Sequence, residues 1–437
     1  MRLNHVITAV AVLPELFLCG CSAPSQVPSS IPPSTQPSVV AYDPPSRFDL
    51  INTVRLAGAD GTTRGVIDGL SYYTMDSMAN IVGLDVGSGK TLWSTPLLQS
   101  GTSTTWACPV QVVDDQNVYT LAADQAPDDA PTPVTLTAVD KRSGHVAWRY
   151  KPAISGHLYP DYCDVAPNYQ LTVTKAGLLL SIIGSNDGQY SEMLDSTSGA
   201  ALWHSDNTVQ ATGDAAYGIA ISPPITTPGG SPVKVRTINL TTGVLGDVLV
   251  DVGYLIFYTP VVFLAGQAGD NLVIARQDQV QPEPGQDVNG ATWTMQITLV
   301  SASTGHPQQS APLTITPAGW DTCTVATDTT LVCTTQDQDG VPTAYGIALA
   351  DGKTLWQHSY APANNLLVPS AATLYHGYLY GTDPTNGDSF VLDTATGDVL
   401  SHDSYPQLTA VNQFGAVFAV VDATGTAWQT WWAPAIG

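Results

Sequence analysis

Two acidic turns are the nearest approach to metal-binding chemistry in this sequence. They are Asp383 to Asp388 (DPTNGD) and Asp337 to Gly340 (DQDG). Carboxylate and amide oxygens are calcium ligands, but neither turn has the D-x-[DN]-x-[DN]-G spacing that a distant glutamate completes. Aspartate, asparagine and glycine equally suit a solvated hairpin turn, which is the interpretation we favour. The eight histidines are dispersed without metal-ligand spacing, so the sequence predicts no metal site.

Motifs for covalent and cofactor chemistry are missing from the sequence. It contains no G-x-S-x-G nucleophile elbow, no P-loop and no C-x-x-C-H haem attachment site. We therefore predict no catalytic residue and no cofactor, and a protein that is not an enzyme.

Four cysteines lie beyond the N-terminal region: Cys108, Cys163, Cys323 and Cys333. An even number of cysteines in an exported chain predicts two disulfides. Cys323 and Cys333 flank a hairpin with its turn near Asp328, so they can lie directly opposite each other on neighbouring strands. Cys108 and Cys163 then remain as a pair between two repeats, partly by exclusion. The alternative is four buried free thiols.

The N-terminus predicts export and anchoring. Residues 1–21 combine Arg2 with an apolar segment, Val6 to Leu18, that is too short to span a bilayer. They end in Leu-Cys-Gly-Cys21, which resembles the lipobox of bacterial lipoproteins, and this resemblance implies that Cys21 carries the lipid. The alternative is a plain signal peptide. Residues 22–47 are rich in proline and serine, which predicts an extended, disordered tether.

The net charge of −23 limits the possible partners. Nucleic acid requires a basic face, so nucleic-acid binding is not expected. Electrostatic docking to anionic lipid is not expected either.

A repeated turn-and-strand pattern organises the rest of the chain. It consists of an aspartate, a serine, a glycine four residues after the aspartate and a tryptophan four residues after the glycine. Complete copies are Asp85–Gly89–Trp93, Asp140–Gly144–Trp148 and Asp195–Gly199–Trp203, with the glycines 55 residues apart. A looser copy keeps Gly352 and Trp356, and copies without tryptophan end at Gly243, Gly305 and Gly397. We interpret each copy as a β-hairpin corner whose glycine has positive φ and whose tryptophan packs over that glycine.

Repeats at intervals of roughly 45–60 residues are typical of propeller blades. Residues 48–437 therefore predict one all-β domain, an eight-bladed β-propeller of four-stranded antiparallel blades, with seven blades as the alternative. The C-terminal region supplies only three strands of the last blade, which would leave an open edge. We expect Phe48–Ala57 to return as its fourth strand and close the ring.

The corner pattern D-x-x-[ST]-G-x-x-x-W resembles the tryptophan-docking repeat of the pyrroloquinoline-quinone-like propeller family. Blade-docking roles are implied for Trp93, Trp148, Trp203 and Trp356. The family includes quinoprotein dehydrogenases, the lipoprotein of the outer-membrane barrel-assembly machinery and other envelope lipoproteins. Its quinone enzymes have a vicinal disulfide and a calcium site of Glu, Asn and Asp, and the sequence contains no adjacent cysteine pair.

The face opposite the corners is the predicted binding face. The loops between blades and those between the second and third strands of a blade all emerge there, including the two longest insertions, Asp124–Pro133 and Arg276–Thr292. Propellers usually bind partners at a loop-bearing face. Aromatic residues just before inner strands also fall there: Trp106, Tyr159, Tyr162, Tyr258 and Trp320. Interfaces are enriched in such residues. The alternative is that these rings fill the core around the propeller axis.

Together these features predict a monomeric, lipid-anchored propeller on the extracytoplasmic side of the cell membrane. It would act as a scaffold that binds a protein or a cell-envelope ligand. The alternatives are a divergent quinoprotein dehydrogenase and a barrel-assembly-type lipoprotein of the outer membrane.

Overall fold

The computed structural model describes the residues 39–59, 65–76, 80–97, 106–123, 134–152, 169–183, 189–222, 233–252, 261–279, 293–308, 313–315, 322–336, 342–359, 373–382, 389–403, 408–421 and 428–437. The chain divides into two units, Met1–Ser38 and Val39–Gly437. All described residues belong to the second unit. They include 39–47, the last part of the segment that the sequence predicts to be a tether.

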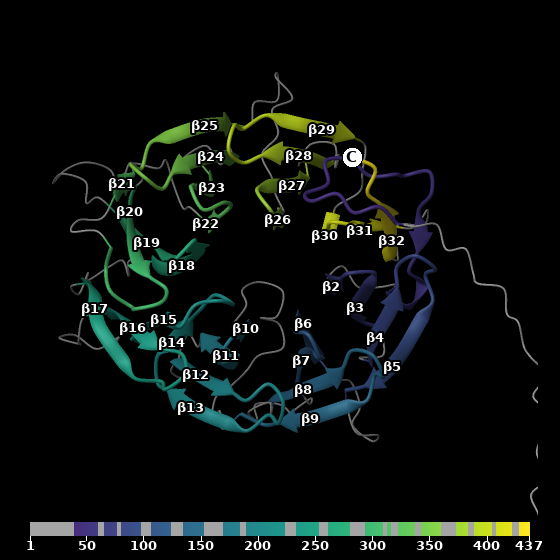
Figure 1. Cartoon of the computed structure of the whole chain (residues 1–437), viewed down its shortest axis with the longest axis horizontal. Coiled ribbons are helices and arrows are strands. Elements are labelled where there is room, and N and C mark those ends of the chain that lie inside the picture. The colour runs from purple at the N-terminus through teal and green to yellow at the C-terminus, as the bar shows by residue number, and fades with distance from the viewer. Residues whose placement is uncertain are drawn as a thin grey trace, which may run out of the picture. The chain divides into compact units, whose positions relative to one another are not determined.

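The second unit contains eight four-stranded antiparallel sheets, placed around a ring as the blades of a propeller (Figure 1). The first four blades are β2–β5 (Gly65–Asp68, Ser71–Met75, Asn80–Asp85, Thr91–Pro96), β6–β9 (Trp106–Val113, Asn117–Ala123, Val134–Asp140, Val146–Tyr150), β10–β13 (Tyr169–Thr174, Gly177–Ile183, Gln189–Leu194, Ala201–Ser205) and β14–β17 (Thr208–Gln210, Tyr217–Ile221, Val233–Asn239, Leu245–Val252). Blades five to seven are β18–β21 (Val261–Ala268, Asn271–Gln279, Trp293–Ser301, Leu313–Ile315), β22–β25 (Thr322–Val325, Thr330–Gln336, Pro342–Ala348, Thr354–Ser359) and β26–β29 (Thr373–Tyr375, Tyr378–Thr382, Ser389–Asp393, Val399–Asp403).

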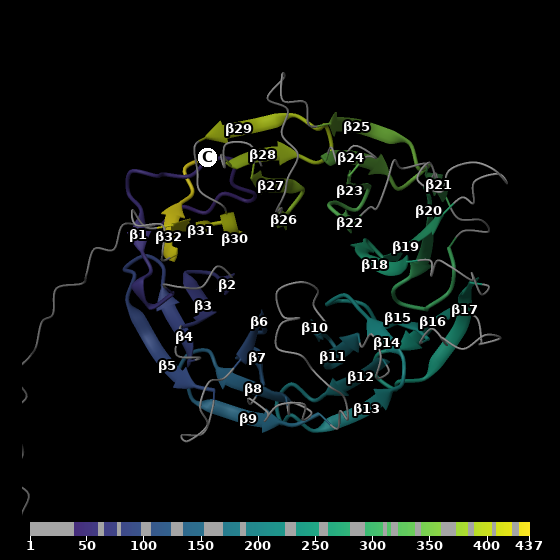
Figure 2. The ribbon, with the colours of Figure 1, turned by 180° about the vertical axis from the view of Figure 1, so that it is seen from behind.

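The eighth blade joins the two ends of the propeller. Its strands are β30 (Leu408–Asn412), β31 (Gly415–Val421), β32 (Trp428–Pro434) and, from the N-terminal side, β1 (Val54–Arg55). The backbone pairing also includes a bridge from Phe48 to Ala435. The C-terminal end therefore lies beside the purple N-terminal segment in both views (Figures 1 and 2). Eight blades and closure by the segment after Arg47 are confirmed, although only two residues of that segment form regular strand.

The core is divided among the joints between blades. Eight buried apolar clusters occur, one between each pair of neighbouring blades. The sequence of strand β11 is an almost continuous apolar run, and the two joints on either side of the strand explain this. Leu178 and Leu180 pack toward blade two, whereas Leu179 between them packs toward blade four. Alternate side chains point to opposite faces of a strand, so a blade that is covered on both faces needs apolar residues at both.

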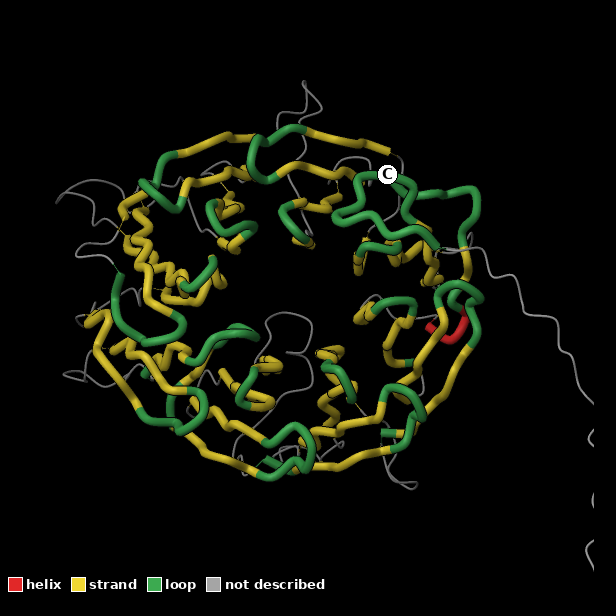
Figure 3. The backbone as a smooth tube through the Cα atoms, in the orientation of Figure 1, coloured by secondary structure: helices red, strands yellow, loops and turns green. Residues whose placement is uncertain are grey.

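The turn between the third and fourth strands of a blade is called here its corner. The side chain of Asp140 accepts hydrogen bonds from the backbone N–H groups of Arg142 and Ser143, and Gly144 has a φ of 72°. This Asx turn is the corner that the repeat predicts. The described helical structure is the short 3₁₀ helix η1 (Ala57–Ala59), red in Figure 3. No helix within the described ranges is long and apolar enough to cross a membrane.

Candidate functional site

The tryptophans of the repeat connect neighbouring blades. The indole N–H of Trp148 donates to the carbonyl oxygen of Ser196, in the corner of blade three, at 3.0 Å. Trp93, Trp203 and Trp356 donate in the same way to Lys141, Leu240 and Thr394, each in the corner of the next blade. Our expectation that each tryptophan packs over the glycine of its own corner is wrong. Trp148 covers Gly199 of the next blade, because side chains on an outer strand face the adjacent blade across the joint.

The joints differ at the residue two positions after the tryptophan. In blade one this position is Thr95, whose hydroxyl donates to the carbonyl of Gly144 in the next corner. In blade six it is His358, with a ring nitrogen 2.7 Å from the carbonyl of Gly397. In blade two it is Tyr150, and its hydroxyl instead donates to Oε1 of Glu192 at 2.5 Å.

Glu192 is the most unusual polar group among the described residues. It lies on β12 with only 4% of its surface exposed, and its second oxygen, Oε2, is buried without a hydrogen-bond partner. Leu194 and Tyr190, two residues to either side of it, both belong to the apolar joint with blade two. A buried carboxylate oxygen without a donor is costly, so a hydrogen-bond donor brought to this atom would stabilise it.

Two tyrosines and a histidine surround this carboxylate. Tyr190 stacks on His204 with ring centroids 6.4 Å apart, and His204 is the direct cross-strand neighbour of Glu192. Burial, followed by the hydrogen bond to Glu192, raises the pKa of Tyr150 above its ordinary value of 10.0. Burial, followed by the nearby Glu192 charge and hydrogen bonding to Glu192, raises the pKa of Tyr190 as well. Both hydroxyls therefore remain protonated near neutral pH and can serve as hydrogen-bond donors.

The structure does not describe most of the residues of the predicted binding face. Tyr159, Tyr162, Tyr258 and Trp320 lie outside the described residues, as does Asp124–Pro133. Trp106 is the first residue of β6 rather than a residue ahead of the strand, and its side chain is not described. The insertion expected at Arg276–Thr292 starts later, because β19 continues to Gln279.

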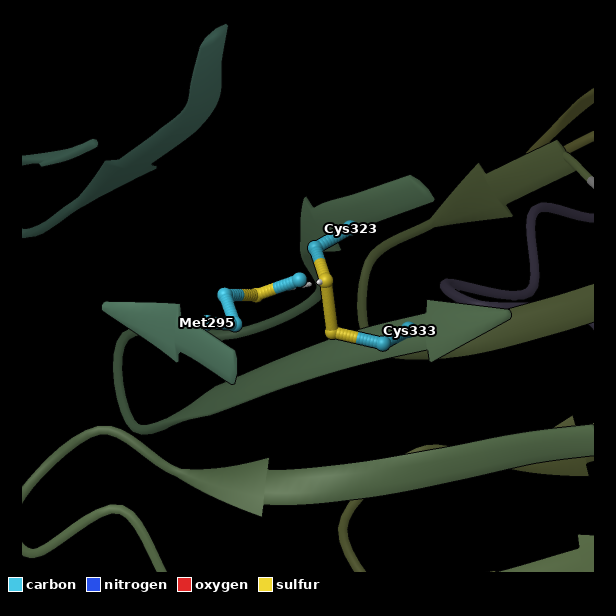
Figure 4. The surroundings of a disulfide bond; sticks show 3 residues. All are labelled: Met295, Cys323 and Cys333. Carbon is cyan, nitrogen blue, oxygen red and sulfur yellow. Dashed lines mark hydrogen bonds between the residues drawn. A yellow bond between two sulfur atoms is a disulfide. The ribbon is translucent and has the colours of Figure 1, made fainter. Parts of the chain in front are cut away.

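The disulfide between Cys323 and Cys333 is present, with the two cysteines directly opposite on β22 and β23. The sulfur of Cys323 lies 3.4 Å from that of Met295 on blade five (Figure 4). This bond thus contributes to the joint between blades five and six. Cys163 lies outside the described residues, and only the backbone of Cys108 on β6 is described, so their pairing stays a prediction.

Glu192 is not among the site residues predicted above, although the sequence carries a signal for it. Glu192 is three residues before the corner aspartate Asp195. The matching positions of the other repeats hold Val82, Thr137, Arg236, Thr298, Tyr345 and Phe390. A carboxylate in the middle of a strand that is buried on both faces is therefore visible once the repeats are aligned.

The donor set for a calcium–quinone site is not assembled by the residues that the structure describes. Within those residues no three His, Cys, Asp or Glu side chains are grouped so that they could hold a metal ion. Glu192 is the only glutamate among them, and it lies in a joint between blades. These residues do not fit the site that the family's quinone enzymes use.

Comparison with known proteins gives similarities to the same kind of propeller. The family described as outer membrane protein assembly factor BamB matches residues 37–161. The crystal structure of BamB from Moraxella catarrhalis is similar over 88% of this chain and 100% of its own, with 14% identity and a TM-score of 0.51. Two quinohemoprotein alcohol dehydrogenases have lower TM-scores. The match to the enzyme from Pseudomonas putida HK5 covers 86% of this chain and 75% of the enzyme, at 11% identity and a TM-score of 0.49. The match to the enzyme from Comamonas testosteroni covers 89% of this chain and 76% of the enzyme, at 11% identity and a TM-score of 0.47.

No curated protein matches the sequence. At 14% identity, the similarity to BamB concerns the fold alone. The matched segment contains two complete corner repeats, those of Trp93 and Trp148, and the remaining repeats continue the same architecture through eight blades. The chain is therefore an eight-bladed β-propeller with repeats that resemble the pyrroloquinoline-quinone-like type, and its similarity to the BamB family extends over residues 37–161.

Proposed function

We propose that this protein is a lipid-anchored propeller on the extracytoplasmic side of the cell membrane, where it binds a protein or a cell-envelope ligand without catalysing a reaction. The observation that carries the binding role is the buried Oε2 of Glu192, which has no hydrogen-bond partner. Blades one and six complete their joints with a bond to the next corner, so the propeller architecture does not itself require a carboxylate there.

The chemistry of this site favours a ligand with an N–H or O–H donor. An ionised carboxylate in an apolar joint is stabilised most by a charge-assisted hydrogen bond, such as one from an ammonium or guanidinium group. Lysine and arginine side chains of a protein partner have this chemistry, as do amino groups of cell-envelope polymers.

The binding role is tested by cross-linking and capture from intact envelopes. Glu192→Gln keeps the size of the side chain but removes its charge, and it should reduce the captured partner at least tenfold while Tm changes little. The matched control is Thr137→Val, at the same position of blade two, where the buried hydroxyl also has no hydrogen-bond partner. Equal capture by Glu192→Gln and the parent chain would exclude Glu192 as the binding group.

The aromatic residues of the predicted binding face have their own test. Trp106→Ala and Trp320→Ala should weaken capture and leave Tm nearly unchanged if these rings contact the partner, because interface aromatics commonly contribute about 2 kcal/mol or more. A fall of Tm by many degrees would instead assign both rings to the core.

The anchor is tested separately at Cys21. A chain with this cysteine should incorporate labelled fatty acid and fractionate with membranes, and Cys21→Ser should lose the label. Label that persists on Cys21→Ser would exclude lipidation at this residue.

Two alternatives have distinct readouts. A divergent quinoprotein dehydrogenase would oxidise alcohols or sugars in a dye-linked assay after reconstitution with quinone and calcium. A barrel-assembly role is suggested by the name of the matching family, outer membrane protein assembly factor. In that case the captured partners would be outer-membrane assembly proteins.

A further inference from the structure

Residues 39–47, which directly precede the closing segment, form a strap across blades seven and eight. In both views this purple segment lies beside these two blades (Figures 1 and 2). Its backbone is bound near both ends. The N–H of Tyr42 donates to the carbonyl of Gln413 at 2.7 Å, and the N–H of Arg47 donates to the carbonyl of Gly437 at 3.0 Å. The strap therefore follows one defined path over the propeller.

Two hydroxyl groups of blade seven bind carbonyl groups of the strap. The hydroxyl of Tyr380 on β27 donates to the carbonyl of Pro45 at 2.7 Å, and the hydroxyl of Ser401 on β29 donates to the carbonyl of Ser46 at 2.7 Å. Pro45 is buried in this position. Because proline has no N–H, its carbonyl is its only backbone hydrogen-bonding group. Side chains of the propeller thus bind the backbone of the strap as they would bind the backbone of a peptide ligand.

The acidic residue of the strap has a partner of its own. Nδ1 of His376, in the turn between β26 and β27, lies within hydrogen-bond distance of a carboxylate oxygen of Asp43. His376 has a φ of 45°, in the left-handed region that few side chains adopt, and its ring stacks on Tyr375 with centroids 4.1 Å apart. The turn therefore presents an oriented imidazole to a carboxylate that directly precedes two prolines.

Comparison with other blades shows that both hydroxyl groups replace contacts between blades. Ser401 follows Gly397 by four residues, which is the position of the docking tryptophan in blades one, two, three and six. Those indoles donate to the corner of the next blade, whereas Ser401 donates to the strap. Tyr380 is the third residue of β27, as Tyr119 is of β7, and the hydroxyl of Tyr119 contacts the next corner at Ser196. Blade seven directs both groups to the strap instead.

Closure of the ring begins after the strap. Phe48 bridges to Ala435, and β1 pairs with β32. The chain before Val39 belongs to the other unit, so the strap continues into the propeller only at its C-terminal end. The side chains of Asp43 and His376 are both more than half exposed, and exposed ion pairs contribute little stability. The strap can therefore detach locally while the ring remains closed.

We propose that the surface formed by Tyr380, Ser401 and His376 binds a proline-containing segment of a protein partner, and that the strap occupies this site in the free protein. The partner segment has the chemistry of the strap. It carries an acidic residue that pairs with His376, followed by two prolines, and its next carbonyl groups accept the two hydroxyl hydrogens. Prolines have little backbone freedom to lose on binding, which favours such a segment. Neither Glu192 nor an anchor at Cys21 takes part in this site.

The test compares two full-length chains. One is the parent, and the other has a weakened strap with Asp43→Ala, Pro44→Gly and Pro45→Gly, which removes the carboxylate and increases the entropy lost on docking. The probe is a fluorescein-labelled peptide with the sequence of residues 39–47. Fluorescence anisotropy should show about tenfold tighter binding to the weakened-strap chain, because the strap of the parent competes with the peptide. A scrambled peptide of the same composition is the control, and thermal melting shows that the variant is folded.

Two substitutions in the weakened-strap chain identify the residues of the site. Tyr380→Phe removes the donor to the Pro45 carbonyl and should weaken peptide binding about fivefold. Tyr119→Phe is the matched control at the same position of blade two, and it should leave peptide binding unchanged. A peptide with Asn in place of Asp43 should bind less tightly to the weakened-strap chain, and His376→Gln should abolish this preference for the acidic peptide.

Four results would overturn the proposal. The first is a folded weakened-strap chain that does not bind the peptide, and the second is equal affinity of the two chains. The third is an equal effect of Tyr380→Phe and Tyr119→Phe. The fourth is dimerisation of the parent that the free peptide reverses, since the occupant would then be the strap of a second copy. If the three substitutions in the strap prevent folding, Asp43→Ala alone replaces them, and the same comparison of affinities decides.

Discussion

Trp148 of blade two packs against Gly199 of blade three so closely that a Cβ on this glycine would come within 2.6 Å of the indole ring. The same relationship joins Trp93 to Gly144, Trp203 to Gly243 and Trp356 to Gly397. The joint between blades four and five has no docking tryptophan, and Tyr217 from β15 covers Gly305 in its place. The corner glycine is thus needed both for its positive φ and for the space above it.

Gly199→Ala should separate these two requirements. Adding a Cβ at a φ of 71° costs roughly 1–2 kcal/mol, and the contact with Trp148 adds about 1–3 kcal/mol of overpacking. Gly69→Ala is the control, because Gly69 has a φ of 58° but open space where the added Cβ would lie. Urea unfolding should show the larger loss for Gly199→Ala, and equal losses would mean that the contact with the indole has no energetic importance.

Trp148→Ala should reduce the stability of the protein. Removal of an indole that is buried between blades costs on the order of 3–5 kcal/mol. Trp148→Phe keeps much of the ring but loses the hydrogen bond to Ser196, which should cost about 1 kcal/mol beyond the lost volume. Similar losses are expected at Trp93 and Trp356. An effect below about 0.5 kcal/mol would contradict the docking role.

Deletion of residues 48–57 should destabilise or aggregate the protein. It removes β1 and the bridge from Phe48 to Ala435, and so exposes the edge of β32. Deletion of 22–38 is the control, since residues 39–47 make hydrogen bonds to the propeller and should be kept. Thermal melting of the two variants decides the matter. Equal Tm values would show that closure does not depend on this strand.

The raised pKa values of Tyr150 and Tyr190 predict a loss of stability in alkali. Their contribution is complete below the ordinary tyrosine pKa of 10.0 and is lost as the pH rises through the higher folded values, because the unfolded chain releases its protons first. The free energy of unfolding should therefore fall above about pH 10 in the parent chain. Tyr150→Phe should flatten this dependence, and an unchanged slope would show that the hydroxyl is not shielded in the folded state.

The fold was predictable because its main determinants are local. A corner needs an aspartate that can bond the next N–H groups and a glycine with positive φ, and both occur at regular intervals in the sequence. The pairing of Cys323 with Cys333 was predictable for a similar reason, since a short hairpin fixes which residues lie opposite each other. The unpaired strand composition after Arg47 indicated closure of the ring, because three strands alone leave an open edge.

The contacts between blades depended on the tertiary structure. Sequence spacing places Trp148 near Gly144, yet the indole lies over Gly199, because the face of an outer strand meets the neighbouring blade rather than its own corner. Glu192 looked like one more strand residue until the joint brought it to Tyr150 and left its Oε2 without a partner. Local sequence specifies turns and strands, whereas burial and partners arise only when distant segments pack together.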